Sequence, residues 1–113
     1  MKKLARCRTC SRVIAGKGGG LADPKYPRKH RQADGSECPG SNLDCEVIDL
    51  PDLIRSELVA GGPGTCDDVA QRVAASSTLT RQALHHLRGA QRADYRSGNR
   101  RRSHGPLRVW FPV

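Results

Sequence analysis

The sequence predicts an α+β fold in two parts, a small N-terminal module over residues 1–46 and a larger domain over residues 47–113. Three observations lead to this prediction. Residues 1–46 contain four of the five cysteines but few large apolar side chains. Apolar residues then recur at helical spacing in three successive stretches. The chain closes on a segment in which apolar and polar residues alternate, which is typical of a strand.

Composition bounds the size of the core and the kind of partner. With 113 residues, of which 36% are hydrophobic and 4% aromatic, the chain can bury one moderate core but not two large ones. The net charge of +9 favours a polyanionic partner. Residues 47–78 hold two basic and five acidic side chains, whereas residues 79–113 hold eight arginines and one acid. This segregation predicts one acidic and one basic face on the larger domain.

The cysteines are expected to stay reduced. No apolar run near the start resembles a signal peptide, and no stretch is long enough to span a membrane. We therefore expect a cytoplasmic protein without a membrane partner. In that compartment, clustered cysteines bind metal more often than they form disulfides.

Four residues of the N-terminal module have the spacing of metal ligands. Cys7 and Cys10 form a Cys-x-x-Cys motif, and His30 and Cys38 can complete the tetrahedron that Zn²⁺ prefers. A segment with so little apolar surface cannot order itself without such a cross-link. Four basic side chains nearby are expected to offset the thiolate charge, namely Arg8, Arg12, Lys29 and Arg31.

Other ligand sets remain open at this point. Cys45 can replace His30, because the Cys38-x6-Cys45 spacing is reachable. Four thiolates can also hold an iron–sulfur cluster, and a module without metal is the remaining alternative. Cys66 is expected to be a buried core cysteine and not a ligand.

Three helices are expected in the larger domain. The first carries Leu50, Leu53, Ile54 and Leu58 on one face and ends at the glycines of residues 61–64. The second begins at residues 65–68, where Thr65 can cap it. Its expected apolar face consists of Cys66, Val69, Ala70 and Val73.

The third helix follows a turn at residues 76–78 and is expected over residues 79–91. A strand over residues 92–96, a polar tip over residues 97–105 and a strand over residues 107–111 complete the domain. Short strands are expected around residues 12–15 and near Leu21. The apolar positions of the third helix are Leu79, Ala83, Leu84, Leu87 and Ala90.

Basic residues mark the third helix and the hairpin tip as candidate DNA-binding elements. Arginine pairs with guanine edges and glutamine with adenine edges, while a basic tip can grip phosphates. Arg81, His85, Arg88 and Arg92 are spaced to form a stripe opposite the apolar face, flanked by Thr78 and Gln82. The tip carries Arg100, Arg101, Arg102 and His104.

With these motifs, residues 49–113 resemble a bacterial winged helix-turn-helix domain. Residues 68–87 look like the second helix, turn and recognition helix of that family, residues 88–95 like the step into the wing, and residues 107–111 like its last strand. Thr80, where an apolar residue is usual, and Ala75, in place of the common leucine, depart from the pattern. Residues 1–46 resemble short zinc modules of actinobacterial and phage proteins, with Cys-x-x-Cys, a later His and Cys-Pro-Gly-Ser.

The resemblance implies a sequence-specific regulator of transcription that binds double-stranded DNA, of a kind that phages also encode. Residues 79–91 would read the major groove and the wing at residues 97–105 would hold the flank, with a homodimer compatible with this arrangement. The alternative is an interaction protein whose zinc module binds host transcription or replication machinery, with incidental DNA affinity. No nucleophile elbow, phosphate loop or carboxylate pair is present, so an enzyme is not expected.

Overall fold

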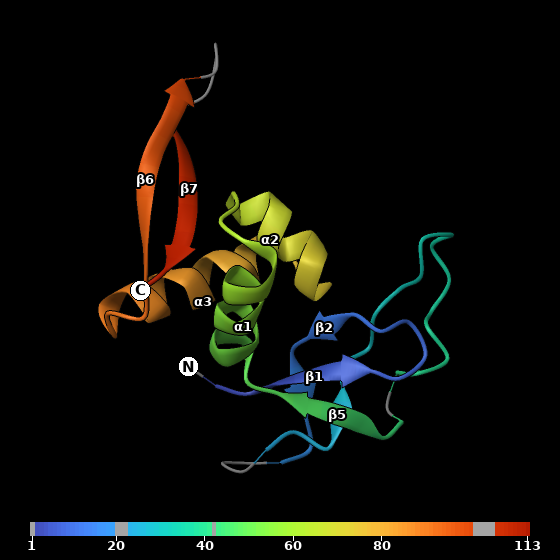
Figure 1. The fold of residues 1–113 in the computed structure, drawn as a ribbon. Coiled ribbons are helices and arrows are strands. Elements are labelled where there is room, and N and C mark those ends of the chain that lie inside the picture. Colours follow the sequence, from blue (N-terminus) through green and yellow to red (C-terminus); the bar gives the residue numbers. More distant parts are fainter. Residues whose placement is uncertain (1, 20–22, 42, 101–105) are drawn as a thin grey trace. The chain divides into compact units, whose positions relative to one another are not determined.

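The structure is a computed structural model that describes residues 2–19, 23–41, 43–100 and 106–113. The strand expected near Leu21 and the tip residues Arg101 and Arg102 lie outside the described residues. The chain divides into two compact units, Lys2–Leu50 and Pro51–Val113. The described residues form three helices and three small sheets, which makes the chain α+β (Figure 1).

The N-terminal unit is built on a three-stranded antiparallel sheet in the order β2-β1-β5. Its strands are β1 (Leu4–Cys7), β2 (Val13–Ile14) and β5 (Cys45–Ile48). A second pair joins β3 (Gly16–Lys17) to β4 (Tyr26–Pro27). Its buried hydrophobic side chains among the described residues are few: Leu4, Ala5, Cys7, Val13, Cys38, Cys45, Ile48 and Leu50.

The C-terminal unit contains three helices followed by an antiparallel hairpin. The helices are α1 (Leu50–Gly61), α2 (Cys66–Val73) and α3 (Ser77–Gly89), and the hairpin strands are β6 (Ala93–Arg100) and β7 (Pro106–Pro112). The order of elements predicted from the sequence is confirmed, although both strands are longer than expected. The side chains buried in this unit include Ile54, Leu58, Val69, Ala70, Val73, Thr80, Ala83, Leu84, Leu87, Ala93 and Trp110.

Local hydrogen bonds explain where α2 begins and ends. The Thr65 hydroxyl accepts from the Asp68 amide, and the Asp68 carboxylate accepts from the Thr65 amide, both at 3.2 Å. This reciprocal capping box confirms the predicted start. At the other end Ala74 has a left-handed backbone with φ of 57°, and the Ala75 amide donates to the Ala70 carbonyl at 3.1 Å. The chain thus leaves α2 through a tight turn of the kind that often carries glycine.

The bounds of α3 differ from the prediction. The Ser76 hydroxyl accepts from the Leu79 amide at 3.2 Å, so Ser76 is the cap and the helix starts at Ser77. The helix ends at Gly89, and Gln91 has a positive φ of 60°. Ala90, which was predicted on the apolar face, therefore lies beyond the helix and is exposed.

The hairpin is tied to the connection between α1 and α2. The Trp110 amide donates to the Gly64 carbonyl at 2.8 Å, and the Gly64 amide donates to the Trp110 carbonyl at 3.0 Å. Sequence reasoning treated this glycine-rich connection only as a helix breaker. The two bonds make it a partner of β7 and anchor the base of the hairpin.

Replacing Thr80 by Val is expected to stabilise the C-terminal unit by about 1 kcal/mol. The Thr80 side chain is fully buried, and its hydroxyl has no hydrogen-bond partner among the described residues. Valine removes the unsatisfied group while keeping the shape. Chemical denaturation measures the free energy of unfolding of Thr80→Val. The Thr78→Val variant is the control, because Thr78 is an exposed residue of the same helix. A loss of stability in Thr80→Val alone would mean that the hydroxyl is satisfied in solution.

Candidate metal centre and basic helix surface

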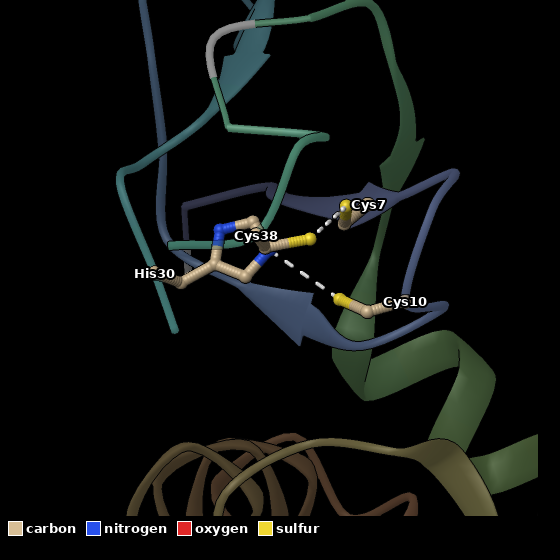
Figure 2. Close-up of side chains that lie close together, drawn as sticks. All are labelled: Cys7, Cys10, His30 and Cys38. Carbon is tan, nitrogen blue, oxygen red and sulfur yellow. Dashed lines mark hydrogen bonds between the residues drawn. The ribbon is translucent and has the colours of Figure 1, made fainter. Parts of the chain in front are cut away.

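Four side chains converge in the N-terminal unit. Cys7, Cys10, His30 and Cys38 each offer one ligand atom, and these atoms all lie within 4.8 Å of one another (Figure 2). The Cys7 and Cys38 sulfurs are 3.8 Å apart, and the Cys10 sulfur is 3.3 Å from Nε2 of His30. These are the four residues that the sequence singled out, and together they could hold a metal ion.

Two short turns bring the cysteines together. Cys7 ends β1, and its carbonyl accepts from the Ser11 amide at 2.8 Å, which turns the chain so that Cys10 faces back. The second turn is held by the Ser41 amide, which donates to the Cys38 carbonyl at 3.0 Å. A side chain at Gly40 would place its Cβ 2.3 Å from the Cys7 sulfur. Glycine is therefore required for the two turns to approach this closely.

His30 presents one defined nitrogen to the sulfurs. Its Nδ1 lies 2.7 Å from the Arg28 carbonyl oxygen, which can only accept, so Nδ1 carries the hydrogen. Nε2 then has its lone pair free toward the thiols. Metal-binding histidines are commonly oriented by such a second hydrogen bond. Burial alone would lower the pKa of His30, but the Arg28 carbonyl and the Cys10 and Cys7 thiols raise it.

The backbone favours a thiolate at Cys7. Burial alone would raise the pKa of Cys7, but hydrogen bonds from the Cys10 and Thr9 amides, together with the Cys10 and Cys38 thiols, lower it to about 6. Burial raises the pKa of Cys38, although the Gly40 amide acts in the opposite direction. Metal ligation requires deprotonated sulfur, and a bound cation favours that form further.

The flanking basic residues interact with other groups. Arg8 pairs with Asp44 at 3.6 Å and Lys29 with Glu37 at 3.9 Å. The guanidiniums of Arg12 and Arg31 donate to carbonyl oxygens, those of Arg31 and Gly35 respectively. The backbone amides of Cys10 and Thr9, and not these four side chains, favour the thiolate of Cys7. The expectation that the four side chains offset the thiolate charge is therefore wrong.

The remaining cysteines stand outside this group. Cys45 lies opposite Cys7 in the sheet, but its thiol points to the Pro24 carbonyl at 3.9 Å, and burial raises its pKa. Cys66 is half-buried and not fully buried as predicted, and its thiol donates to the Ser77 carbonyl at 3.5 Å. Burial also raises the pKa of Cys66, against the effect of the Arg81 guanidinium beside it.

The outer face of α3 is polar and exposed. Its inner face is buried through Thr80, Ala83, Leu84 and Leu87. The side chains exposed on the other side include Thr78, Arg81, Gln82, His85 and Arg88. Five of the residues predicted to contact DNA therefore lie together on one solvent-facing helix.

Two of the predicted arginines are engaged within the unit. The Arg88 guanidinium bonds to Asp94 at 3.1 Å and lies 4.7 Å from the centre of the Tyr95 ring. Arg92 follows the end of α3 and pairs with Asp52 at 2.8 Å. The prediction that Arg92 continues the helical stripe is wrong, because the helix stops at Gly89.

Sequence reasoning missed a cluster that joins α3 to the hairpin. The His85 and Trp110 rings pack edge to face, with centres 5.3 Å apart, and the Tyr95 ring lies 4.9 Å from that of Trp110. The guanidinium of Arg108 stacks on Tyr95 at 4.6 Å. Tyr95 and Trp110 are direct partners across β6 and β7. Counting outward from the Arg100–Pro106 pair would match Tyr95 with Phe111 instead, because the irregularity between Ser97 and Arg100 shifts the register by one residue.

The hairpin strands carry exposed basic side chains. Arg100 ends β6, but its side chain, like Arg101 and Arg102, lies outside what the structure describes. The described strands nevertheless carry the exposed side chains of Arg96 and Arg108 close to the tip.

Comparison of the chain with models of protein families and with curated proteins found no match. Within the described residues, no helix has both the length and the apolar character needed to cross a bilayer.

Proposed function

We propose that this protein is a zinc-containing, sequence-specific DNA-binding protein that regulates transcription, and that Pro51–Val113 acts as a winged helix-turn-helix. The observation that carries the proposal is the outer face of α3, where Thr78, Arg81, Gln82 and His85 are exposed on a helix whose inner face is buried. The early part of the second helix of such a motif lies nearest the base edges in the major groove. Arg81 and Gln82 have the side chains that read guanine and adenine there.

The packing around α3 supports a reading role. The short turn at the left-handed Ala74 lets α3 pack directly against α2. His85 packs on Trp110, and Arg88 is fixed between Asp94 and Tyr95. A helix that recognises bases must be held rigidly, because base discrimination depends on directional hydrogen bonds. Arg108, stacked on Tyr95, extends the basic surface onto the hairpin, where phosphate contact is expected.

The geometry of the metal centre supports zinc. A tetrahedron with metal–sulfur bonds of ~2.3 Å has sulfur–sulfur edges of ~3.8 Å. The Cys7 and Cys38 sulfurs are 3.8 Å apart. Three sulfurs and one nitrogen favour zinc over an iron–sulfur cluster held by four thiolates, because Cys45 is not part of the group. Four protein ligands leave no open position, so the ion would cross-link the unit and not react.

Selection of bound sequences from a random duplex library tests the function. We expect the metal-loaded protein to enrich one motif, and the Arg81→Ala variant to enrich it poorly. Gln71→Ala is the control, since Gln71 is exposed on α2. If the wild-type protein enriches no motif and binds all duplexes weakly, the alternative function gains support.

The alternative function is a module that binds transcription or replication proteins. The exposed side chains of Leu43, just before the edge strand β5, and of Val47, within it, favour that alternative.

A further inference from the structure

The N-terminal unit has a second feature that the metal centre does not use. A hollow of about 430 Å³ is lined by segments from the start of β1, from β2 to β3, and from either side of β4. None of the four clustered metal-ligand residues lines it. Its charged lining residues are Lys2, Lys3, Lys17, Asp23 and Arg28. We propose that this hollow binds backbone phosphates of duplex DNA, an inference that rests on the proposed DNA-binding function.

The backbone gives the hollow a defined shape. The Arg28 amide donates to the Ala15 carbonyl at 3.0 Å, which extends the pairing of β3 with β4 by one step. Lys17 and Arg28 therefore stand diagonally on the same face of this strand pair. A Cβ at Gly16 would lie 2.3 Å from Cβ of Pro24, so a glycine is needed where the segments meet. The two cations are thus carried on closely packed backbone.

The charge of the hollow is unbalanced. Lys3 pairs with Asp23 at 3.8 Å, and both side chains are at least half exposed, so this pair is weak. Lys2, Lys17 and Arg28 are exposed and have no carboxylate within salt-bridge distance in the described part of the chain. Four cations against the one carboxylate of Asp23 leave an excess of positive charge, and a concave surface with such an excess concentrates its electrostatic potential. The hollow is therefore attractive to an anion.

The lining favours phosphate over other anionic surfaces. It contains no aromatic, asparagine or glutamine side chain that would read a base. Lysine acts as a flexible point charge, which suits a phosphate whose position varies along DNA. The largest apolar side chain of the lining, Leu4, is buried, so none is free to insert into a membrane. The contact is therefore expected to be independent of DNA sequence.

A contact of this kind acts together with α3 because both are in one chain. Once one unit has bound, the other binds at a high effective concentration. Each phosphate contact adds ~0.9 to the slope of log affinity against log salt concentration. The hollow should therefore make binding stronger and more dependent on salt without changing the preferred sequence.

The experiment compares two triple variants of the full, metal-loaded chain. One variant, Lys2→Gln/Lys17→Gln/Arg28→Gln, neutralises the hollow. The control, Arg8→Gln/Lys25→Gln/Lys29→Gln, changes the net charge equally at exposed positions outside it. Fluorescence anisotropy measures affinity for a selected and a random duplex over a range of salt concentrations, and metal content verifies folding.

The hollow variant should lose affinity for both duplexes by roughly tenfold, and its salt slope should fall by ~2–3. The affinity of the control variant should fall by no more than about threefold, because its only change is a smaller net charge. Equal losses in the two variants would overturn the inference. So would binding of millimolar inorganic phosphate to the wild type, lost in the hollow variant, that leaves the affinity for DNA unchanged at constant ionic strength, because the hollow would then be a site for a small anion.

An Arg81→Ala variant measured in parallel separates the two proposals. If it loses affinity while the hollow variant behaves like its control, the DNA-binding function stands and only the hollow is misassigned. If the wild-type protein binds neither duplex, both the function and the inference are overturned.

Discussion

With zinc bound as proposed at Cys7, Cys10, His30 and Cys38, removing the ion is expected to unfold residues Lys2–Leu50 while residues Pro51–Val113 stay folded. The N-terminal unit buries few hydrophobic side chains among its described residues, and structural zinc contributes an apparent ~10–16 kcal/mol in small zinc domains. Without it the strands have too little apolar surface to offset their conformational entropy. The C-terminal unit has its own core of helices, so a chelator should not unfold it.

The Cys10→Ser variant should show the same behaviour without a chelator. Native mass spectrometry should find about one zinc per wild-type chain and none in the variant, and amide exchange should lose its protection only in the first unit. The Cys45→Ser variant is the matched control, because Cys45 is buried in the same sheet but is not part of the ligand group. Loss of zinc from Cys45→Ser with retention in Cys10→Ser would show that the ligand set is wrong.

The Gly40→Ala variant tests the geometry of the site separately from its ligands. The added methyl group would lie 2.3 Å from the Cys7 sulfur, so the two turns must move apart. We expect zinc to bind more weakly although all four ligands remain. Gly35→Ala is the comparison, since an added Cβ at Gly35 meets nothing within 4 Å. Its positive φ of 89° adds backbone strain in the connecting loop but leaves the ligand turns unchanged.

Replacing Arg81 or Gln82 by Ala should reduce affinity for the selected duplex by about 5- to 150-fold, which corresponds to roughly 1–3 kcal/mol. Both residues are exposed near the start of α3, where the proposed docking brings the base edges closest. Affinity for random duplexes should change much less, because base contacts carry sequence information while phosphate contacts mainly fix position.

Arg108→Ala should behave differently from the helix variants. Arg108 stacks on Tyr95 of the hairpin, so its expected partner is a phosphate, and both duplexes should weaken by similar factors. Competition assays at one fixed salt concentration make the comparison, with Gln71→Ala as control. The opposite result would be an equal loss of affinity for both duplexes in the helix variants and a loss for the selected duplex alone in Arg108→Ala. In that case the hairpin contacts the bases and α3 contacts the phosphates.

Features that depend on neighbouring residues could be predicted from the sequence. The capping box at Thr65 involves groups three residues apart, and the helical spacing of apolar residues set the order of elements, so both could be read locally. The sequence also selected Cys7, Cys10, His30 and Cys38, but it left Cys45 open as a replacement for His30. Spacing limits which ligands can meet, but it does not orient their side chains.

Features that depend on distant groups could not be predicted in this way. Cys45 faces Cys7 across the sheet, yet its thiol turns to the Pro24 carbonyl while His30 enters the group. Arg92 is bound to Asp52, 40 residues away. The helix α3 begins at Ser77, two residues before the predicted start at Leu79. Residues 76–78 can each cap a helix, and what distinguishes them is the packing that buries Thr80. Interactions between distant residues depend on how the chain closes on itself, and no local pattern contains that information.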